Sequence, residues 1–450
     1  MSVTYGADEH AKVADEKGPS GADAYDDVDV FGREEGAQIR YKTLSWQFVS
    51  VLMIAEIVSN GMLSLPSALA IVGIVPAVII IIFMGTFALF TAKLLIDFKL
   101  NHPEVHNMGD AGYILAGPIG REVLSMGTII FAIFATGSEL LSGQQALSSL
   151  SDNGLCAMLL VLIFAVASFF VALPRTLDRL SYLGLVSVSF IAIAGIVAMI
   201  GAGINPTPGR TIDAAKSSDF FNAFVAITNP VFAFAGHFMF FILISEMKRP
   251  QDAMKAAWCL QGFSTIFYVV FSVVIYVYIG NTVQSPAFLS LPPTWAKVAF
   301  GIALGNFLLA SGLYAHTAAK LLFIRFFRNS KHLHTHTVLG WTVWTFLCFI
   351  AVAIAFVLAI AVPIFSYLIG IAASLFASWY TYGIAGFFWL HDTYYLKGGK
   401  AALRRDMTGT IIAILTVLIG AFICVAGTYV SIKLIAVAYE THIVPEPFTC

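Results

Sequence analysis

An apolar run from about residue 48 to residue 75 is interrupted near its middle by polar and helix-breaking residues. The run is long enough to cross a bilayer, whose hydrocarbon core needs roughly 20 apolar residues as an α-helix. It nevertheless contains Glu56, a Ser-Asn-Gly triplet at 59–61 and Pro66. Because glycine costs about 1 kcal/mol and proline about 3 kcal/mol inside a helix, we expect the helix to open over 59–65. Unpaired backbone at this depth is tolerated only where it is buried in protein or lines a cavity. The segment is therefore a candidate binding site, with a kinked helix that binds nothing as the alternative.

The rest of the chain predicts an all-α polytopic membrane protein. Of its 450 residues, 59% are hydrophobic and 11% are charged, against a usual charged share of about 25%. Apolar runs of spanning length predict eleven transmembrane helices, at about residues 45–72, 74–98, 122–148, 155–174, 180–203, 221–246, 257–280, 295–324, 338–361, 364–390 and 408–436.

The distribution of Lys and Arg predicts the orientation of these spans. If the N-terminus is cytosolic, 21 of the 25 basic residues fall on the cytosolic side, as the positive-inside rule requires. This count assigns Lys320 to a cytosolic loop, and the odd number of spans puts the C-terminus outside. The net charge of −1 gives no basic field that would indicate nucleic acid as a partner.

The sixth run, at about 221–246, is interrupted in the same way as the first. Asn229 and Pro230 lie near its middle, and Gly236 and His237 follow a short aromatic segment. The first and sixth runs each open a set of five spans. Paired interruptions at corresponding positions are the best sequence indication of an inverted repeat with a binding site near the membrane midplane. A proline placed by chance in each helix is the alternative.

Both interruptions resemble the signatures of the amino acid/auxin permease family. The matching stretches are Gly-Met-Leu-Ser-Leu-Pro at 61–66 and Phe-Ala-Phe-Ala-Gly-His at 232–237, with Glu-Met-Lys-Arg-Pro at 246–250. The resemblance covers about residues 44–436, and the nearest relatives look like fungal neutral amino acid permeases. It implies the leucine-transporter (LeuT) fold, a 5+5 inverted repeat with broken helices 1 and 6, followed here by helix 11.

The resemblance and the runs together divide the chain. The expected parts are a disordered cytosolic tail (1–43), a first five-helix repeat (44–203), an outer loop (204–220), a second repeat (221–391), a cytosolic loop (392–407), the eleventh helix (408–436) and an outer tail (437–450).

A zwitterionic amino acid needs partners for its carboxylate and its ammonium group in a low-dielectric site. The amides that begin a half-helix near Gly61 suit the carboxylate, and carbonyls freed near Ile57, Val58, Phe232 and Ala233 suit the ammonium. The aromatic and small side chains of the second break indicate an apolar, neutral substrate. The expected substrate-binding residues are Ser59, Asn60, Gly61, Met62, Phe232, Ala233, Phe234 and Ala235. Gly137, Ser138, Ser142, Gln144, Ser311 and Tyr314 are further lining candidates or simply helix-packing residues.

Ionisable residues inside spans are functional candidates by default. Glu56 is a candidate for binding a coupled proton, or else a neutral carboxyl bonded to a neighbouring helix. His237 could titrate or could hold the unwound backbone. Glu246, beside Lys248 and Arg249, could form an inner gate or an ordinary interfacial ion pair. Glu139 is a weaker candidate, because neighbouring serines could satisfy its carboxyl.

The expected function is a secondary active transporter, not an enzyme, that imports neutral aliphatic and aromatic amino acids with a proton by alternating access. Sodium-coupled animal members of the family carry an asparagine near Ala55. This chain lacks it, and its absence favours a proton over sodium as the coupled ion. The alternatives are a non-transporting sensor, a channel-like facilitator, and a sodium-coupled or vacuolar transporter. The expected location is the plasma membrane rather than the vacuole. We expect no cofactor and no metal site, and His332-Leu333-His334-Thr335-His336 is interpreted as a solvated loop. The scattered cysteines indicate no disulfide framework, and the oligomeric state is not predicted.

Overall fold

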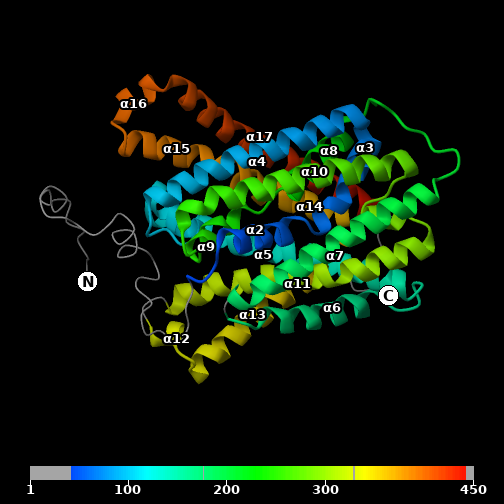
Figure 1. Ribbon diagram of the computed structural model, residues 1–450, viewed down its shortest axis with the longest axis horizontal. Coiled ribbons are helices and arrows are strands. Elements are labelled where there is room, and N and C mark those ends of the chain that lie inside the picture. The colour runs from blue at the N-terminus through cyan, green and yellow to red at the C-terminus, as the bar shows by residue number, and fades with distance from the viewer. Residues whose placement is uncertain (1–41, 176, 328–329, 442–450) are drawn as a thin grey trace, which may run out of the picture.

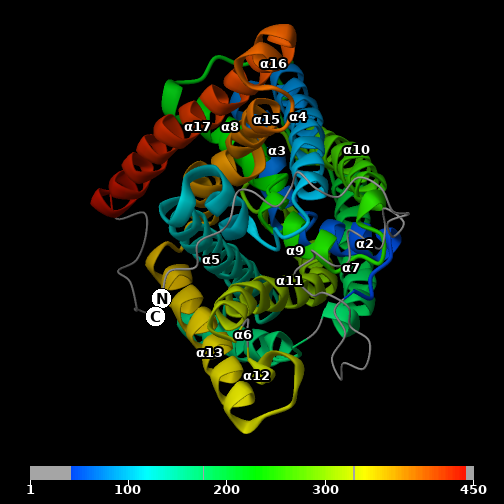
Figure 2. The ribbon, with the colours of Figure 1, turned by 90° about the vertical axis from the view of Figure 1, so that its left-hand side faces the viewer.

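The structure is a computed structural model that describes residues 42–175, 177–327 and 330–441. Within these ranges the elements are helices, and the one pairing of extended backbone is an isolated bridge between Leu44 and Met247. The long helices run along the long axis of the molecule (Figure 1). Seen end on, α5 (Met108–Leu150) and α11 (Pro293–Phe327) cross the middle of the bundle and the other helices surround them (Figure 2).

The first span is broken where the sequence predicts. It consists of α2 (Trp46–Ile57), a 3₁₀ turn η1 (Asn60–Ser64) and α3 (Leu65–Val72), and its two halves meet at an angle of about 40°. Ser59 is non-helical, with φ −134° and ψ −131°. Pro66 lies in the first turn of α3, where its missing amide costs nothing because no helical partner is needed there.

The sixth span is broken in the same manner. It consists of α8 (Phe220–Ala233), a 3₁₀ turn η2 (His237–Met239) and α9 (Phe240–Ser245). Pro230 lies inside α8, and the non-helical residues 234–236 end at Gly236. The remaining long elements are α4 (Ile74–Asn101), α6 (Ala157–Ala172), α7 (Leu177–Ile204), α10 (Ala253–Ile279), α13 (Val338–Ala361), α14 (Phe365–Ala372), the π-helix η5 (Ala373–Gly383), α15 (Ile384–Tyr395) and α17 (Met407–Glu440).

Nine helical stretches of the described chain are long and apolar enough to cross a membrane, and the bent pair of the first span makes ten. The remaining predicted span corresponds to α6, which is apolar but only 16 residues long. The count of eleven spans therefore stays a prediction. The fold class is confirmed: the protein is an all-helical, multi-pass membrane protein.

Helix α5 differs from the predicted third span. It begins at Met108, capped by the Asn107 side chain, rather than near residue 122. The sequence hides this because the added part is kinked: Ala116 and Gly117 are non-helical and Pro118 follows them. The short connecting helices are η3 (Pro250–Asp252), η4 (Ala287–Ser290), α12 (Lys331–His334) and α16 (Gly399–Arg405).

Two predictions were wrong: that the histidine tract is a solvated loop, and that the cysteines form no disulfide. The histidine tract is not a freely solvated loop, because it includes α12 and the buried Arg175 donates a 2.8 Å hydrogen bond to the His332 carbonyl. Cys156, which precedes α6, is disulfide-bonded, although the cysteine spacing indicated no disulfide.

Helix α17 continues to Glu440, beyond the predicted end near residue 436. The predicted N-terminal tail up to residue 41, and residues 442–450 of the C-terminal tail, lie outside the described residues.

Candidate functional site

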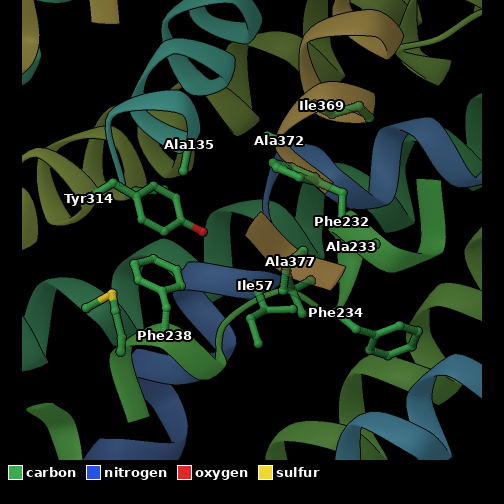
Figure 3. Close-up of a cluster of buried hydrophobic side chains, with 14 of the residues drawn as sticks. Ile57, Ala135, Phe232, Ala233, Phe234, Phe238, Tyr314, Ile369, Ala372 and Ala377 are labelled. Atoms are coloured by element: carbon green, nitrogen blue, oxygen red, sulfur yellow. The ribbon is translucent and has the colours of Figure 1, made fainter. Parts of the chain in front are cut away.

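The two breaks lie against each other. A Cβ atom added to Gly61 would lie 3.0 Å from the Cα of Ala233, and one added to Gly236 would lie 2.4 Å from Cδ1 of Ile57. Each break therefore places a glycine where the other span approaches most closely. Figure 3 shows Ile57, Ala233 and their apolar neighbours in this region, all of which are buried.

The carbonyls freed by the breaks converge on Tyr268 of α10. Its hydroxyl oxygen lies 2.8 Å from the carbonyl oxygen of Ile57 and 2.8 Å from that of Ala233. A hydroxyl has one hydrogen, so it satisfies one of these two acceptors at a time. The site therefore has more acceptors than donors, which suits a bound group that carries several N–H bonds. Sequence reasoning missed Tyr268, which lies 211 residues from Ile57.

Glu56 lies between the breaks, and its carboxyl is 1% exposed. Neither carboxyl oxygen has a hydrogen-bond partner among the described residues, and Oε1 lies 3.9 Å from the position of a Cβ on Gly236. The backbone carbonyl of Glu56 accepts a 2.7 Å hydrogen bond from the hydroxyl of Tyr314. The structure does not support the alternative that the Glu56 carboxyl is bonded to a neighbouring helix.

The start of η1 is held by side chains from α5 and α11. The amide nitrogen Nδ2 of Asn60 donates to Oγ of Ser138 at 2.9 Å. The hydroxyl of Ser59 donates to Oδ1 of Asn306 at 2.6 Å. Ser138 was predicted as a lining candidate, whereas Asn306 was not. A buried asparagine in an apolar span is a signal that could have found it.

Apolar side chains surround the same point. Figure 3 shows Phe232 beside Ile369 and Ala372, whereas the ring of Phe238 lies next to that of Tyr314. The Phe238 and Tyr314 ring centroids are 6.1 Å apart and the rings are stacked.

Phe234 and Met62 do not point the same way as Phe232. The Phe234 ring turns away from Tyr314 (Figure 3) and packs edge-on against Tyr268, with ring centroids 5.1 Å apart. The side chain of Met62 approaches Gly195 of α7. Ala235 contributes its amide to the Phe232 carbonyl at 2.9 Å. The backbone segments that contain the predicted residues therefore lie together at the breaks, but the side chains of Phe234 and Met62 point away from that region.

The predicted gating residues have different partners from those expected. Nε2 of His237 donates to the Ala88 carbonyl of α4 at 2.8 Å, so His237 does not hold the unwound backbone of its own span. Glu246 pairs with Lys320 of α11, and both side chains are buried. The assignment of Lys320 to a cytosolic loop was therefore wrong. Lys320 lies inside α11, one turn after the buried Thr317, and Glu246 balances its charge within the bundle.

The other predicted lining residues divide between two roles. Tyr314 and Ser138 contact the first break, as described above. Gly137 packs against the Ala355 carbonyl of α13, which would lie 3.2 Å from an added Cβ, so it acts as a helix-packing residue. The hydroxyl of Ser142 bonds the Ser138 carbonyl of its own helix at 3.1 Å.

A cluster of polar residues lies where α4 and α15 end, away from the breaks. The ligand atoms of His102, His391 and Asp392 all lie within 4.8 Å of one another and could hold a metal ion. They already satisfy each other: Nε2 of His102 lies 2.9 Å from Oδ1 of Asp392, and Asn101 donates to Oδ2 at 2.8 Å. Burial alone lowers the pKa of His102, but hydrogen bonds to Asp392 and Glu104 raise it to about 9. A charged His102 therefore holds the cluster together without a metal.

A helical membrane bundle in which two spans are broken and their breaks lie against each other has the arrangement of the LeuT-like transporter fold. A solved Na⁺-coupled sialic acid symporter has the same fold, with a TM-score of 0.57 and 12% identity over 95% of this chain and 97% of that chain. A manganese transporter from Eremococcus coleocola gives a TM-score of 0.56 and 13% identity over 89% of this chain and 93% of that chain. At this identity the likeness shows the fold alone.

The chain belongs to the family of transmembrane amino acid transporter proteins, whose family model matches residues 42–433. It is 30% identical over 434 residues to the N amino acid transport system protein of Neurospora crassa, covering 94% of this chain and 92% of that protein. It is also 30% identical to a transmembrane transporter of Gibberella moniliformis, covering 92% and 88%. The family predicted from the two signatures is confirmed, and the protein is an integral, multi-pass amino acid transporter.

Proposed function

We propose that the protein imports neutral amino acids by proton symport with alternating access around the two breaks. The observation that carries this proposal is the meeting of the breaks, where freed carbonyls from both spans lie 2.8 Å from one hydroxyl. Broken helices of this kind supply both anion-binding amides and cation-binding carbonyls at the bilayer midplane.

The substrate backbone is recognised by protein backbone. The amides of Asn60, Gly61 and Met62, at the start of η1, bind the substrate carboxylate. The carbonyls of Ile57 and Ala233 accept hydrogen bonds from the ammonium group, which brings the extra donors that the Tyr268 hydroxyl lacks. Ser59 and Ala235 complete the two break segments around the substrate.

The side-chain pocket is apolar and accepts aliphatic or aromatic substrates. Phe232 and Phe238 supply its aromatic surface, with Ala372 and Ile369 beside Phe232 (Figure 3). The two acidic residues near the breaks, Glu56 and Glu139, make no ion pair among the described residues, and a cationic substrate is the alternative that they favour. Competition between leucine and lysine separates these two substrate classes.

The coupling ion is a proton, and Glu56 carries it. Support comes from its burial between the breaks with neither oxygen hydrogen-bonded, because an unpaired buried carboxylate is much less stable than a protonated carboxyl. Nδ1 of His237 has no hydrogen-bond partner among the described residues, and Nε2 donates to the Ala88 carbonyl of α4. We assign His237 a gating role, in which this bond makes the sixth span and α4 move together when the site closes. A sodium ion is the alternative, and replacing sodium with choline tests it.

Alternating access opens the end of the bundle where Glu246 meets Lys320. At that end Leu44 also pairs with the chain after α9: its amide donates to the Glu246 carbonyl at 3.0 Å, and its carbonyl accepts from the Lys248 amide at 2.8 Å. These contacts tie the first span, the sixth span and α11 together, and they form the closed inner gate. The distribution of basic residues supports a cytosolic position for this end, and we assign the protein to the plasma membrane.

The test is uptake of labelled leucine by cells that express the chain. Accumulation at acidic outside pH that persists in choline and collapses with a protonophore supports the proposal. Loss of accumulation in choline alone contradicts the proton and retains the transporter. Binding without accumulation would indicate a sensor, and strictly downhill flux would indicate a facilitator.

A further inference from the structure

Glu139 of α5 is a buried carboxyl that lies against the first break. Its side chain is 1% exposed, and neither oxygen is hydrogen-bonded among the described residues. The two groups that face it are the hydroxyl of Ser59 and the backbone N–H of Asn60. The neighbouring serines do not satisfy it, because Ser138 donates to the Ala135 carbonyl and Ser142 to the Ser138 carbonyl.

The direction of hydrogen bonding beside Glu139 is fixed from α7. Nδ2 of Asn306 faces Oγ of Ser187 at 2.9 Å and the Ser187 carbonyl oxygen at 3.4 Å. A carbonyl can only accept, so the NH₂ group of Asn306 must point to Ser187. Its Oδ1 then points to Ser59 and accepts the Ser59 hydroxyl hydrogen at 2.6 Å.

Ser59 therefore has no hydrogen left for Glu139. Its Oγ presents only lone pairs on that side, and two oxygens that both carry only lone pairs repel each other. A protonated Glu139 resolves this conflict, because its O–H donates to Ser59, and a neutral carboxyl gives up the Asn60 N–H to another acceptor more readily than a carboxylate does. An ionised Glu139 would have one donor, in a place that water does not reach.

Among the described residues, Glu139 makes no ion pair. The ionisable groups of this region are Tyr314 of α11, Tyr268 of α10 and Glu56 of α2, and Tyr314 interacts electrostatically with Tyr268 and with both carboxyls. Helices α6 and α13 and the turn η1 contain no charged residue, and α14 has only a tyrosine. The nearest lysine on α11, Lys320, lies six residues beyond Tyr314, about 9 Å along the helix, and is paired with Glu246.

We propose that Glu139 is a proton-binding site that controls entry of the amino acid: the substrate carboxylate binds at Asn60–Met62 only when Glu139 is protonated. This rests on the proposed function, which places that carboxylate on the same amide that Glu139 faces. Two carboxylates at one amide repel each other strongly in a low-dielectric site. The proton therefore binds first and the amino acid second. Glu56 carries the transported proton, whereas Glu139 sets the order of binding.

The experiment measures the KM for labelled leucine in proteoliposomes of the full chain between about pH 5 and pH 8. In the parent protein the KM rises about tenfold per pH unit above the midpoint of Glu139, because only the protonated fraction binds. Glu139→Gln is permanently neutral, so its KM is expected to be independent of pH. The matched control Glu56→Gln is expected to lose accumulation while its KM still rises with pH. A KM that depends on pH in Glu139→Gln as in the parent would overturn the proposal.

A second variant keeps the test informative if Glu139→Gln does not fold. Ser59→Ala removes the acceptor for the Glu139 proton, so the midpoint of the KM profile is expected to move about one unit toward acidic pH. An unchanged or more alkaline midpoint contradicts the proposal. The experiment distinguishes failure of the Glu139 proposal from failure of the proposed transport function. A parent protein that transports leucine with a pH-independent KM refutes the role of Glu139 alone, whereas a parent that transports no neutral amino acid refutes the proposed function.

Discussion

Removing one partner of the buried Glu246–Lys320 pair should open the end of the bundle that it closes. The two side chains are 2% and 4% exposed, so Lys320→Met removes the ammonium group that pairs with the buried Glu246 carboxylate. Breaking a buried ion pair in this way costs about 3–5 kcal/mol. The two backbone bonds of Leu44 remain, at about 1 kcal/mol each. Because these bonds are present in both proteins, the closed state should lose about two to three and a half orders of magnitude in population relative to the open state.

A cysteine placed behind the pair reports this change. Ser245→Cys is suitable because Ser245 is 1% exposed and precedes Glu246 in the chain, and the exposed Cys259 is replaced by serine in all variants. The rate of alkylation at residue 245 is measured against the same background without the new cysteine. We expect Lys320→Met to raise this rate about 100-fold and to abolish accumulation of leucine. Thermal unfolding of the purified protein shows whether the variant is folded.

The matched control is the double variant Glu246→Gln/Lys320→Met, which removes both charges. Replacing both members of a buried pair is often nearly neutral, so alkylation should return to within about threefold of the parent. An alkylation rate that does not change in Lys320→Met would refute the gate. A double variant as reactive as the single one would show that packing, not the charge pair, holds this end closed.

Three further predictions concern other parts of the structure. Tyr268→Phe leaves both freed carbonyls without their shared donor, at a cost of about 1–3 kcal/mol, and should lower the kcat/KM of leucine uptake at least fivefold; uptake equal to the parent would contradict this role. Gly61→Ala places a Cβ 3.0 Å from the Cα of Ala233 and should reduce uptake at least tenfold, whereas Gly262→Ala, with no heavy atom within 4 Å, should have no effect; equal losses in both would argue against the close approach of the breaks. His102 has a pKa raised to about 9, so its stabilising contribution is fully present below about pH 6.5 and is lost as the pH rises through 9. The difference in thermal stability between the parent and His102→Gln should be largest at about pH 6 and absent at about pH 10. A difference that grows with pH would contradict a charged His102 in this cluster.

The breaks could be predicted from the sequence because their causes are local. Glycine and proline weaken a helix wherever they occur, so the opening at Ser59 and the restart at Leu65 follow from a few adjacent residues. The second break could be predicted for the same reason. The family signatures added the relation between the two spans, which local propensity alone does not give.

The partners of the breaks could not be predicted, because they come from distant parts of the chain. Tyr268 meets Ile57 across 211 residues, and Asn306 meets Ser59 across 247. The importance of Glu139 depends on the direction of hydrogen bonds from α7, which no local pattern encodes. Lys320 was misplaced because a lysine near the end of an apolar run usually lies at the interface, and only the tertiary structure shows that Glu246, which follows α9, is its buried partner.

Leucine accumulation in proteoliposomes, driven only by an imposed pH gradient, is the decisive measurement for proton-driven transport. Sodium is absent on both sides, and the outside is acidic. We expect accumulation above the equilibrium level in the parent protein, its collapse on addition of a protonophore, and its loss in Glu56→Gln. Equilibration without accumulation, or accumulation that requires sodium, would contradict proton-driven transport at the two breaks.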